Sequence, residues 1–171
     1  YKEAFQKAIR SLERGRYGLG HAKDFDKKTK KELLAMLHVP SSERQFIMYE
    51  ALRKGATVDE LFELTKIKHY FIQQMKELVE EEESLMQYKG EVPPVEVLRQ
   101  AKLDGFADKY LSELLGVTEE EIRDARTKEG IVEGWEGVHV SGTPDSAYYF
   151  SSYHIKDQSP CSDNKKIMIL G

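Results

Sequence analysis

The chain has 171 residues, of which 40% are hydrophobic and 33% are charged. This length suits one ordinary domain or two small ones, and the hydrophobic share is enough to build a core. The sequence contains no run of about 18 apolar residues, which excludes a membrane-spanning helix, and its single cysteine, Cys161, excludes an internal disulfide. The first residues, Tyr1 and Lys2, begin no apolar signal region. We therefore expect a cytoplasmic protein.

Charge is unevenly distributed along the chain, although the net charge is only −4. Residues 1–54 carry 13 Lys/Arg against 7 Asp/Glu, residues 55–130 carry 10 against 18, and residues 131–171 carry 3 against 5. A basic first third beside an acidic middle predicts two halves that attract each other, or a surface that meets a larger partner.

Apolar residues at helical spacing predict a series of short helices that end at glycine or before proline. In chain order these helices cover residues 1–15, 30–38, 42–55, 57–64, 68–87, 94–105, 108–115 and 118–130. The first has its apolar positions at Phe5, Ala8, Ile9 and Leu12. Three capping boxes predict helix starts: Ser42 with Gln45, Thr57 with Glu60, and Thr118 with Glu121.

The longest predicted helix, residues 68–87, carries an apolar stripe that should be central to the core. The stripe consists of Phe71, Ile72, Met75, Leu78, Val79 and Leu85. If the Phe71 ring is core, its replacement by alanine should cost about 3–5 kcal/mol. Glu80 to Glu83 predict a solvated face, since consecutive residues point around a helix.

From residue 131 the pattern changes to an extended, aromatic-rich stretch that we expect to lie on the helical surface. Its aromatic residues are Trp135, Tyr148, Tyr149, Phe150 and Tyr153. The apolar run Ile167 to Leu170 followed by Gly171 is typical of a buried first strand of an α/β domain, cut short at its glycine-rich turn. The predicted fold is therefore all-α, with two small sub-bundles and an extended tail that ends in a truncated strand. We interpret the chain as a piece of something larger.

Residues 108–126 have the outline of a helix-turn-helix, with a turn at Gly116 and a second helix capped by Thr118. A DNA-reading helix enters a groove lined with phosphates, and the three glutamates after Thr118 oppose this. A packed helical corner is the favoured interpretation, and a nucleic-acid-binding module is the alternative.

No catalytic, cofactor-binding or metal-binding constellation is visible in the sequence. The five histidines, His21, His38, His69, His139 and His154, are scattered, and none stands at ligand spacing from a carboxylate or cysteine. Cys161 lies in a polar stretch without a local histidine partner. A stand-alone enzyme that uses Cys161 or the histidines is the less favoured alternative.

Five groups of residues, in the right order, resemble the central stretch of the large subunit of carbamoyl-phosphate synthase. The first two groups are Phe5, Lys7, Arg10, Leu12, Glu13 and Gly15, and then Gly55, Val58, Leu61, Leu64, Thr65, Ile67, Tyr70 and Phe71. The third group is Lys102, Gly105, Phe106, Asp108, Leu111, Leu114, Thr118, Glu119, Ile122, Arg123 and Arg126. The last two are Ala147-Tyr148 with Phe150, Ser151 and Tyr153, and then Lys166 to Gly171.

The sequence departs from this family at two places. Lys68 stands where the family usually has Asp, so the family's N-cap of the long helix is not carried over. The family's Val-Asp-Thr and Ala-Glu-Phe pieces are not recognisable between Val138 and Asp145.

The resemblance implies a helical oligomerization, or connection, domain between two ATP-grasp halves. It assigns residues 1–16 to the closing helix of the preceding half, 17–130 to the helical domain, 131–164 to a linker, and 165–171 to the first strand of the following half. The family's whole enzyme makes carbamoyl phosphate from bicarbonate, glutamine-derived ammonia and two ATP, with Mg or Mn, for pyrimidine and arginine synthesis. The implied partners are the flanking halves, further copies of the chain and a glutaminase small subunit. The piece itself is expected to hold no cofactor and to catalyse nothing.

We also expect this chain to self-associate, or its residues 156–171 to be held by a neighbouring molecule in a crystal; the alternative is that this tail folds back on its own helices or stays mobile. The aromatic residues around Tyr149 and the unpaired strand Ile167 to Leu170 are the surfaces expected to make that contact, because unpaired strand edges favour pairing with another chain.

Overall fold

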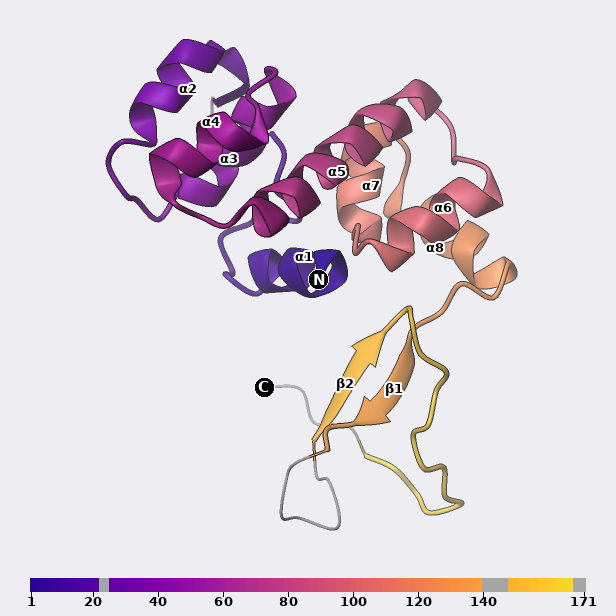
Figure 1. The fold of residues 1–171 in the computed structure, drawn as a ribbon. Coiled ribbons are helices and arrows are strands. Elements are labelled where there is room, and N and C mark those ends of the chain that lie inside the picture. The colour runs from indigo at the N-terminus through magenta and orange to yellow at the C-terminus, as the bar shows by residue number, and fades with distance from the viewer. Residues whose placement is uncertain (22–24, 140–147, 168–171) are drawn as a thin grey trace. The chain divides into compact units, whose positions relative to one another are not determined.

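The computed structural model describes residues 1–21, 25–139 and 148–167, and the chain divides into two units, Tyr1–Ile131 and Val132–Gly171 (Figure 1). The first unit is helical and the second contains a small antiparallel sheet. The predicted, mostly helical fold is confirmed. Of the predicted terminal strand, residues 165–171, only 165–167 lie in the described part, where they are exposed and outside any strand; residues 168–171 fall outside the described residues.

In its described residues the first unit has eight α-helices and two short 3₁₀ turns. The helices are α1 Lys2–Arg10, α2 Lys30–Met36, α3 Arg44–Arg53, α4 Val58–Thr65, α5 His69–Leu85, α6 Val95–Leu103, α7 Asp108–Leu115 and α8 Glu119–Lys128. The 3₁₀ turns are η1 Phe25–Lys27 and η2 Met86–Tyr88. Among these described helices, none is long and apolar enough to cross a membrane.

Helix α5 joins two groups of helices, as Figure 1 shows. It packs with α3 and α4, and α2 packs on α3. Its far end continues into η2, which packs on α7, while α8 packs on α6 and α7. Because helices of this length are marginal alone, each is stabilised by the stripe that it buries against its neighbours.

Local capping explains several helix starts. The boxes at Thr57 and Thr118 are confirmed, and a third box, Thr29 with Glu32, begins α2 and was not predicted. The predicted box at Ser42 is wrong. Residues 41–44 form a separate turn, in which the Arg44 amide donates to the Ser41 carbonyl, so α3 begins after Glu43 without a side-chain cap.

The core of the unit contains most of the predicted stripe of α5. Ile72, Met75, Leu78, Val79 and Leu85 are buried. Phe71 is 39% exposed, so its assignment to the core is wrong. Leu12 is also misassigned: α1 ends at Arg10, which leaves Leu12 beyond the helix and 52% exposed.

In the second unit, strands β1 Gly134–Gly137 and β2 Tyr149–Ser152 pair in antiparallel register, with Trp135 opposite Ser151. The chain after β2 returns beside β1, where the Gln158 amide donates to the Trp135 carbonyl at 2.7 Å. A Cβ at Gly134 would overlap the backbone of residues 155–157, so glycine is required for this close approach. The sequence predicted an extended stretch here but not its pairing.

Candidate functional site

A buried carboxylate, Glu82 of α5, lies at the centre of a charged network inside the helical unit. Its side chain is fully buried. Tyr49 Oη of α3 donates to Glu82 Oε2 at 2.6 Å, and Arg53 Nη2 donates to Oε1 at 2.5 Å. His21 Nε2, from the loop after α1, lies 3.4 Å from Oε1. The network therefore ties α3, α5 and the N-terminal loop together.

The groups around Glu82 keep it ionised in the interior. Burial alone would raise the pKa of this carboxyl, but the hydrogen bonds from His21, Tyr49 and Arg53 and the Arg53 charge lower it. Arg53 is further held by Glu50, at 3.2 Å, and by Glu83. A buried ion network of this kind is costly to break, because removing one partner leaves a buried charge unpaired.

The sequence prediction that Glu80 to Glu83 are solvated is wrong at Glu82. The signal was present in the helical spacing, because Glu82 follows Leu78 and Val79 by four and three residues and precedes Leu85 by three. It therefore lies on the same face as the buried stripe.

A second ion network stabilises the corner between α6, α7 and α8. Lys102 Nζ lies 2.6 Å from Asp108 Oδ1 and donates to the Phe106 carbonyl at 2.7 Å. Arg126 Nε donates to Asp108 Oδ2 at 2.7 Å. The packed corner predicted for residues 108–126 is present, with Gly116 in the left-handed region at φ 73°.

The corner offers little to nucleic acid. Arg126 is committed to Asp108, and Arg123 lies 3.4 Å from Glu119. The first turn of α8 presents Glu119, Glu120 and Glu121. Both arginines that a DNA-binding interpretation needs are therefore engaged with carboxylates of the same chain.

The structure brings some histidines to carboxylates that are remote in sequence. His21 meets Glu82, and His69 Nε2 lies 2.9 Å from Asp59 Oδ1 while its ring stacks on Phe62 at 4.2 Å. These pairs were not predicted. Cys161 is exposed. No group of three or more His, Cys, Asp or Glu able to hold a metal ion occurs among the described residues.

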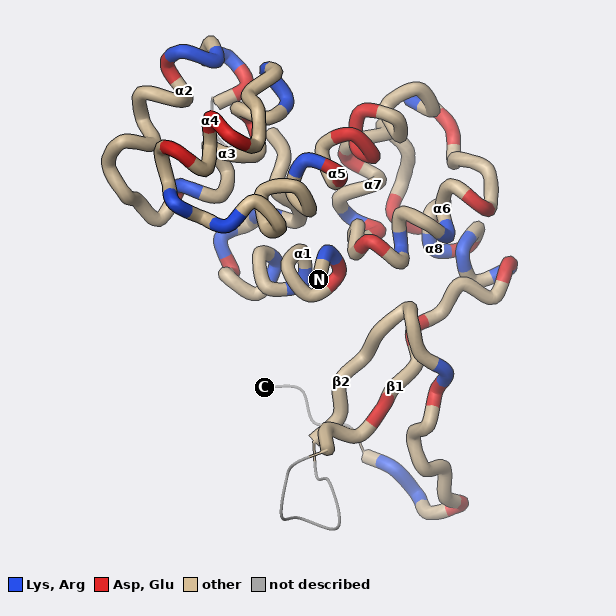
Figure 2. The backbone as a smooth tube through the Cα atoms, viewed as in Figure 1, with Lys and Arg blue, Asp and Glu red and all other residues tan. Residues whose placement is uncertain are grey.

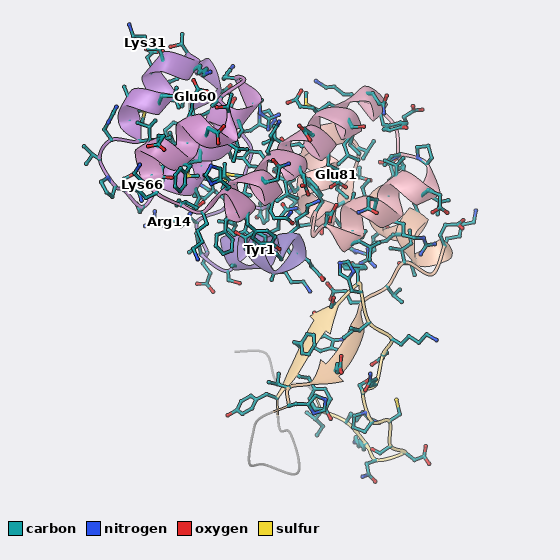
Figure 3. The ribbon with its side chains drawn as sticks, in the orientation of Figure 1. Tyr1, Arg14, Lys31, Glu60, Lys66 and Glu81 are labelled. Atoms are coloured by element: carbon teal, nitrogen blue, oxygen red, sulfur yellow. The ribbon has the colours of Figure 1, made fainter. Side chains whose placement is uncertain are left out.

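An exposed groove runs between α2 and α4. Its apolar lining is Leu34, Ala35 and Leu64. Lysines line its α2 side and acidic groups its α4 side: Lys30 and Lys31 against Asp59, Glu60 and Glu63. Lys30 crosses the groove to Glu60 at 2.8 Å. Lys31, labelled with Glu60 in Figure 3, makes no ion pair within the described residues.

A second exposed surface is an aromatic cluster at the start of α1 and α5. The Tyr1 ring lies 5.6 Å from Phe5, 5.9 Å from Tyr70 and 5.3 Å from Phe71, measured between ring centroids. Tyr70 is 58% exposed. In the second unit, Trp135, Tyr148, Tyr149 and Phe150 are also exposed.

Residues 1–130 match the family described as carbamoyl-phosphate synthetase large chain, oligomerisation domain. The chain is 40% identical over 178 residues to the carbamoyl phosphate synthase large chain of Archaeoglobus fulgidus, with 100% of this chain and 16% of the relative covered. It is 44% identical over 159 residues to the carbamoyl phosphate synthase large chain, N-terminal section, of Aquifex aeolicus, with 90% of this chain and 27% of the relative covered.

A plant relative is similar over the same length. The chain is 36% identical over 180 residues to the arginine-specific large chain, chloroplastic, of Arabidopsis thaliana, with 100% of this chain and 15% of the relative covered. The chain thus spans about a sixth of the length of the relatives from Archaeoglobus and Arabidopsis.

Proposed function

Because this chain belongs to the family of carbamoyl-phosphate synthetase large-chain oligomerisation domains, we propose that it is the helical assembly and connection module of such a large chain. The names of its relatives support this proposal. We assign residues 17–130 to the module, residues 1–16 and 165–171 to the flanking ATP-grasp halves, and residues 131–164 to the linker. The large chain would make carbamoyl phosphate with a glutaminase small subunit and ATP.

The internal chemistry favours a structural role for the module itself. Glu82 and Asp108, the central carboxylates of the two networks, are held by Arg53 and by Lys102 with Arg126, respectively. Charges that are paired inside a fold are costly to separate, because removing one partner leaves the other buried and unpaired, and this suits a structural role. We propose that catalysis belongs to the flanking halves.

The observation that carries the assembly function is the groove between α2 and α4. Its apolar lining is open to solvent, and its two sides have opposite charge. A two-fold axis would place the basic side of one copy against the acidic side of the other, and such isologous contacts form most homodimers. A second copy of this chain is therefore the occupant that we propose.

Charge reversal tests this arrangement in solution. Lys31 and Glu63 are both exposed, so replacing either leaves the core intact. We expect Lys31→Glu and Glu63→Lys each to weaken self-association about tenfold or more in sedimentation equilibrium, since like charges face each other across the contact. The double variant should recover much of the loss. Lys128→Glu, an exposed lysine of α8, is the matched control.

Two results would overturn the groove assignment. One is a pair of single variants that assemble as the unaltered chain does. The other is an assembly that is lost only when residues 156–171 are deleted, which would place the contact on the tail.

A further inference from the structure

Residues 18–21, which follow α1, pack directly on the buried Glu82 network. Leu19 and Gly20 are both buried. A Cβ at Gly20 would overlap Glu82 Oε1 and Arg53 Nη2, so only glycine allows the backbone to approach the network this closely. The segment therefore covers the side of the network that α3 and α5 leave open to it.

His21 is the titratable side chain of this segment, and it joins the buried network to solvent. Its Nε2 lies 3.4 Å from Glu82 Oε1, and its side chain is 47% exposed whereas that of Glu82 is fully buried. The ring borders an open cavity of about 430 Å³, through which solvent protons reach it without unfolding of the helices. The His21 backbone has φ +53°, in the left-handed region that residues other than glycine seldom adopt. The closed segment therefore depends on contacts that hold this conformation.

The electrostatic surroundings of His21 favour its charged form. The contact with Glu82 raises the pKa of His21, and this outweighs the opposing effects of burial and of the Arg53 charge. The pKa of Glu82 is lowered in turn, so both partners favour the ion pair. Within the described residues, the charged and titratable groups around the ring are Glu82 of α5, Glu50 and Arg53 of α3, and Arg16, Tyr17, Lys89, Tyr110 and Glu113 along the cavity.

We propose that His21 is a proton-dependent latch: the charged ring holds residues 18–21 on Glu82, and the neutral ring allows this segment to open. Opening leaves no unpaired charge in the core, because Tyr49 and Arg53 still donate to Glu82 at 2.6 and 2.5 Å. The left-handed backbone at His21 then favours release, since the open segment relaxes it. This inference concerns the fold alone and does not depend on the proposed function.

The direction of the pH effect follows from proton linkage. Because the closed state binds the His21 proton more tightly than the open state does, the stabilisation is fully present below the ordinary histidine pKa of about 6.5. It is lost as the pH rises through the raised pKa of the closed state. Glu82 stays ionised over this range, since its pKa is lowered. Opening should increase about three- to tenfold, as expected for a charge-assisted contact that is half exposed.

Hydrogen exchange of the backbone amides of residues 18–21 from pH 5.5 to 9, corrected for the intrinsic exchange rate, tests the proposal. In the unaltered chain we expect their protection to fall about three- to tenfold relative to α6 as the pH rises. His21→Gln, which is uncharged at every pH, should show low protection throughout, and His21→Lys, which keeps its charge, should abolish the decrease. His139→Gln is the matched control and should behave as the unaltered chain does, because His139 lies 3.9 Å from Glu136 but its side chain is 92% exposed.

The proposal fails if the protection of residues 18–21 does not fall with pH relative to α6, or if His21→Lys keeps the full decrease. A proton NMR titration of the His21 ring in the unaltered chain does not depend on the folding of any variant. A midpoint above about 6.5 supports the proposal, and a midpoint at or below this value overturns it. Glu82→Gln removes the charge but keeps an acceptor for Tyr49 and Arg53, so it should lower the midpoint; an unchanged midpoint would also overturn the proposal.

Discussion

Phe71 and Met75 lie one turn apart on α5 but in different surroundings. Met75 is 2% exposed, whereas Phe71 is 39% exposed and contacts the rings of Tyr1 and Tyr70. Helical spacing places both on one stripe. At the first turn of α5 the stripe reaches the edge of the bundle, so the Phe71 ring packs on other surface aromatics rather than inside the core.

The two side chains should differ in their contribution to stability. We expect Met75→Ala to lower the free energy of unfolding by about 2–5 kcal/mol, since it opens a cavity in a packed core. Phe71→Ala should cost only about 1–2 kcal/mol, because much of the ring already meets solvent. Urea unfolding followed by circular dichroism measures both. Equal losses for the two variants would show that the aromatic cluster is part of the core.

The burial of Glu82 could not be predicted from the residues next to it in the sequence. A run of four glutamates has the composition of a solvated face, and this favoured the wrong prediction. The partners that make burial of Glu82 possible, Tyr49, Arg53 and His21, lie 29 to 61 residues earlier in the chain. Their convergence depends on tertiary packing, which no local pattern encodes.

At the scale of the element, the first turn of α5 lacks a side-chain cap for its backbone amides. Lys68 is its N-cap residue and makes no side-chain cap hydrogen bond. The family resemblance places Asp at this position, so the departure noted in the sequence has a structural counterpart. A lysine also places a positive charge near the positive end of the helix dipole.

Restoring the cap should stabilise the domain. We expect Lys68→Asp and Lys68→Asn to raise the free energy of unfolding by about 0.5–2 kcal/mol, since each supplies an oxygen acceptor for the first-turn amides. Lys68→Ala, which removes the charge without adding an acceptor, is the control and should give little gain. Thermal unfolding of the three variants decides the matter. A gain for alanine as large as that for asparagine would contradict the capping explanation.

Elements that depend on local chemistry could be predicted from the sequence, and those that depend on distant contacts could not. The capping boxes at Thr57 and Thr118 act within four residues, and both form. The start of α3 depends on how the turn at 41–44 folds, and the pairing of β1 with β2 joins Trp135 to Ser151 across the chain. The spacing of apolar residues predicts neither the start of α3 nor the pairing of the two strands.

At the scale of the whole chain, the uneven charge has a structural meaning within the helical unit. Groups of the basic first third meet carboxylates of the acidic middle: Lys2 at Glu77, Lys30 at Glu60, and Arg53 at Glu82. Figure 2 shows both signs of charge on the tube of the helical unit. The attraction predicted between the two parts is present at these three pairs.

The family could be recognised from ordered motifs, but the candidate contact surface could not. Leu34 and Leu64 were predicted as helix residues, and only the packing of α2 beside α4 shows that they line one exposed groove. The same packing places Lys31 and Glu63 on opposite sides of it. The sequence-based prediction favoured the tail as the assembly surface, and the groove is the surface for which the structure offers complementary charges.

Light scattering on the chain at about 100 μM, well above the ~10 μM dissociation constant of a modest interface, tests the assembly role most directly. The unaltered chain should give twice its 19.7 kDa mass. Leu34→Glu, which places a charge in the groove, should give the mass of one chain, while Leu12→Glu at an exposed site should not change the assembly. A single-chain mass for the unaltered protein, or full assembly of Leu34→Glu, would contradict the account.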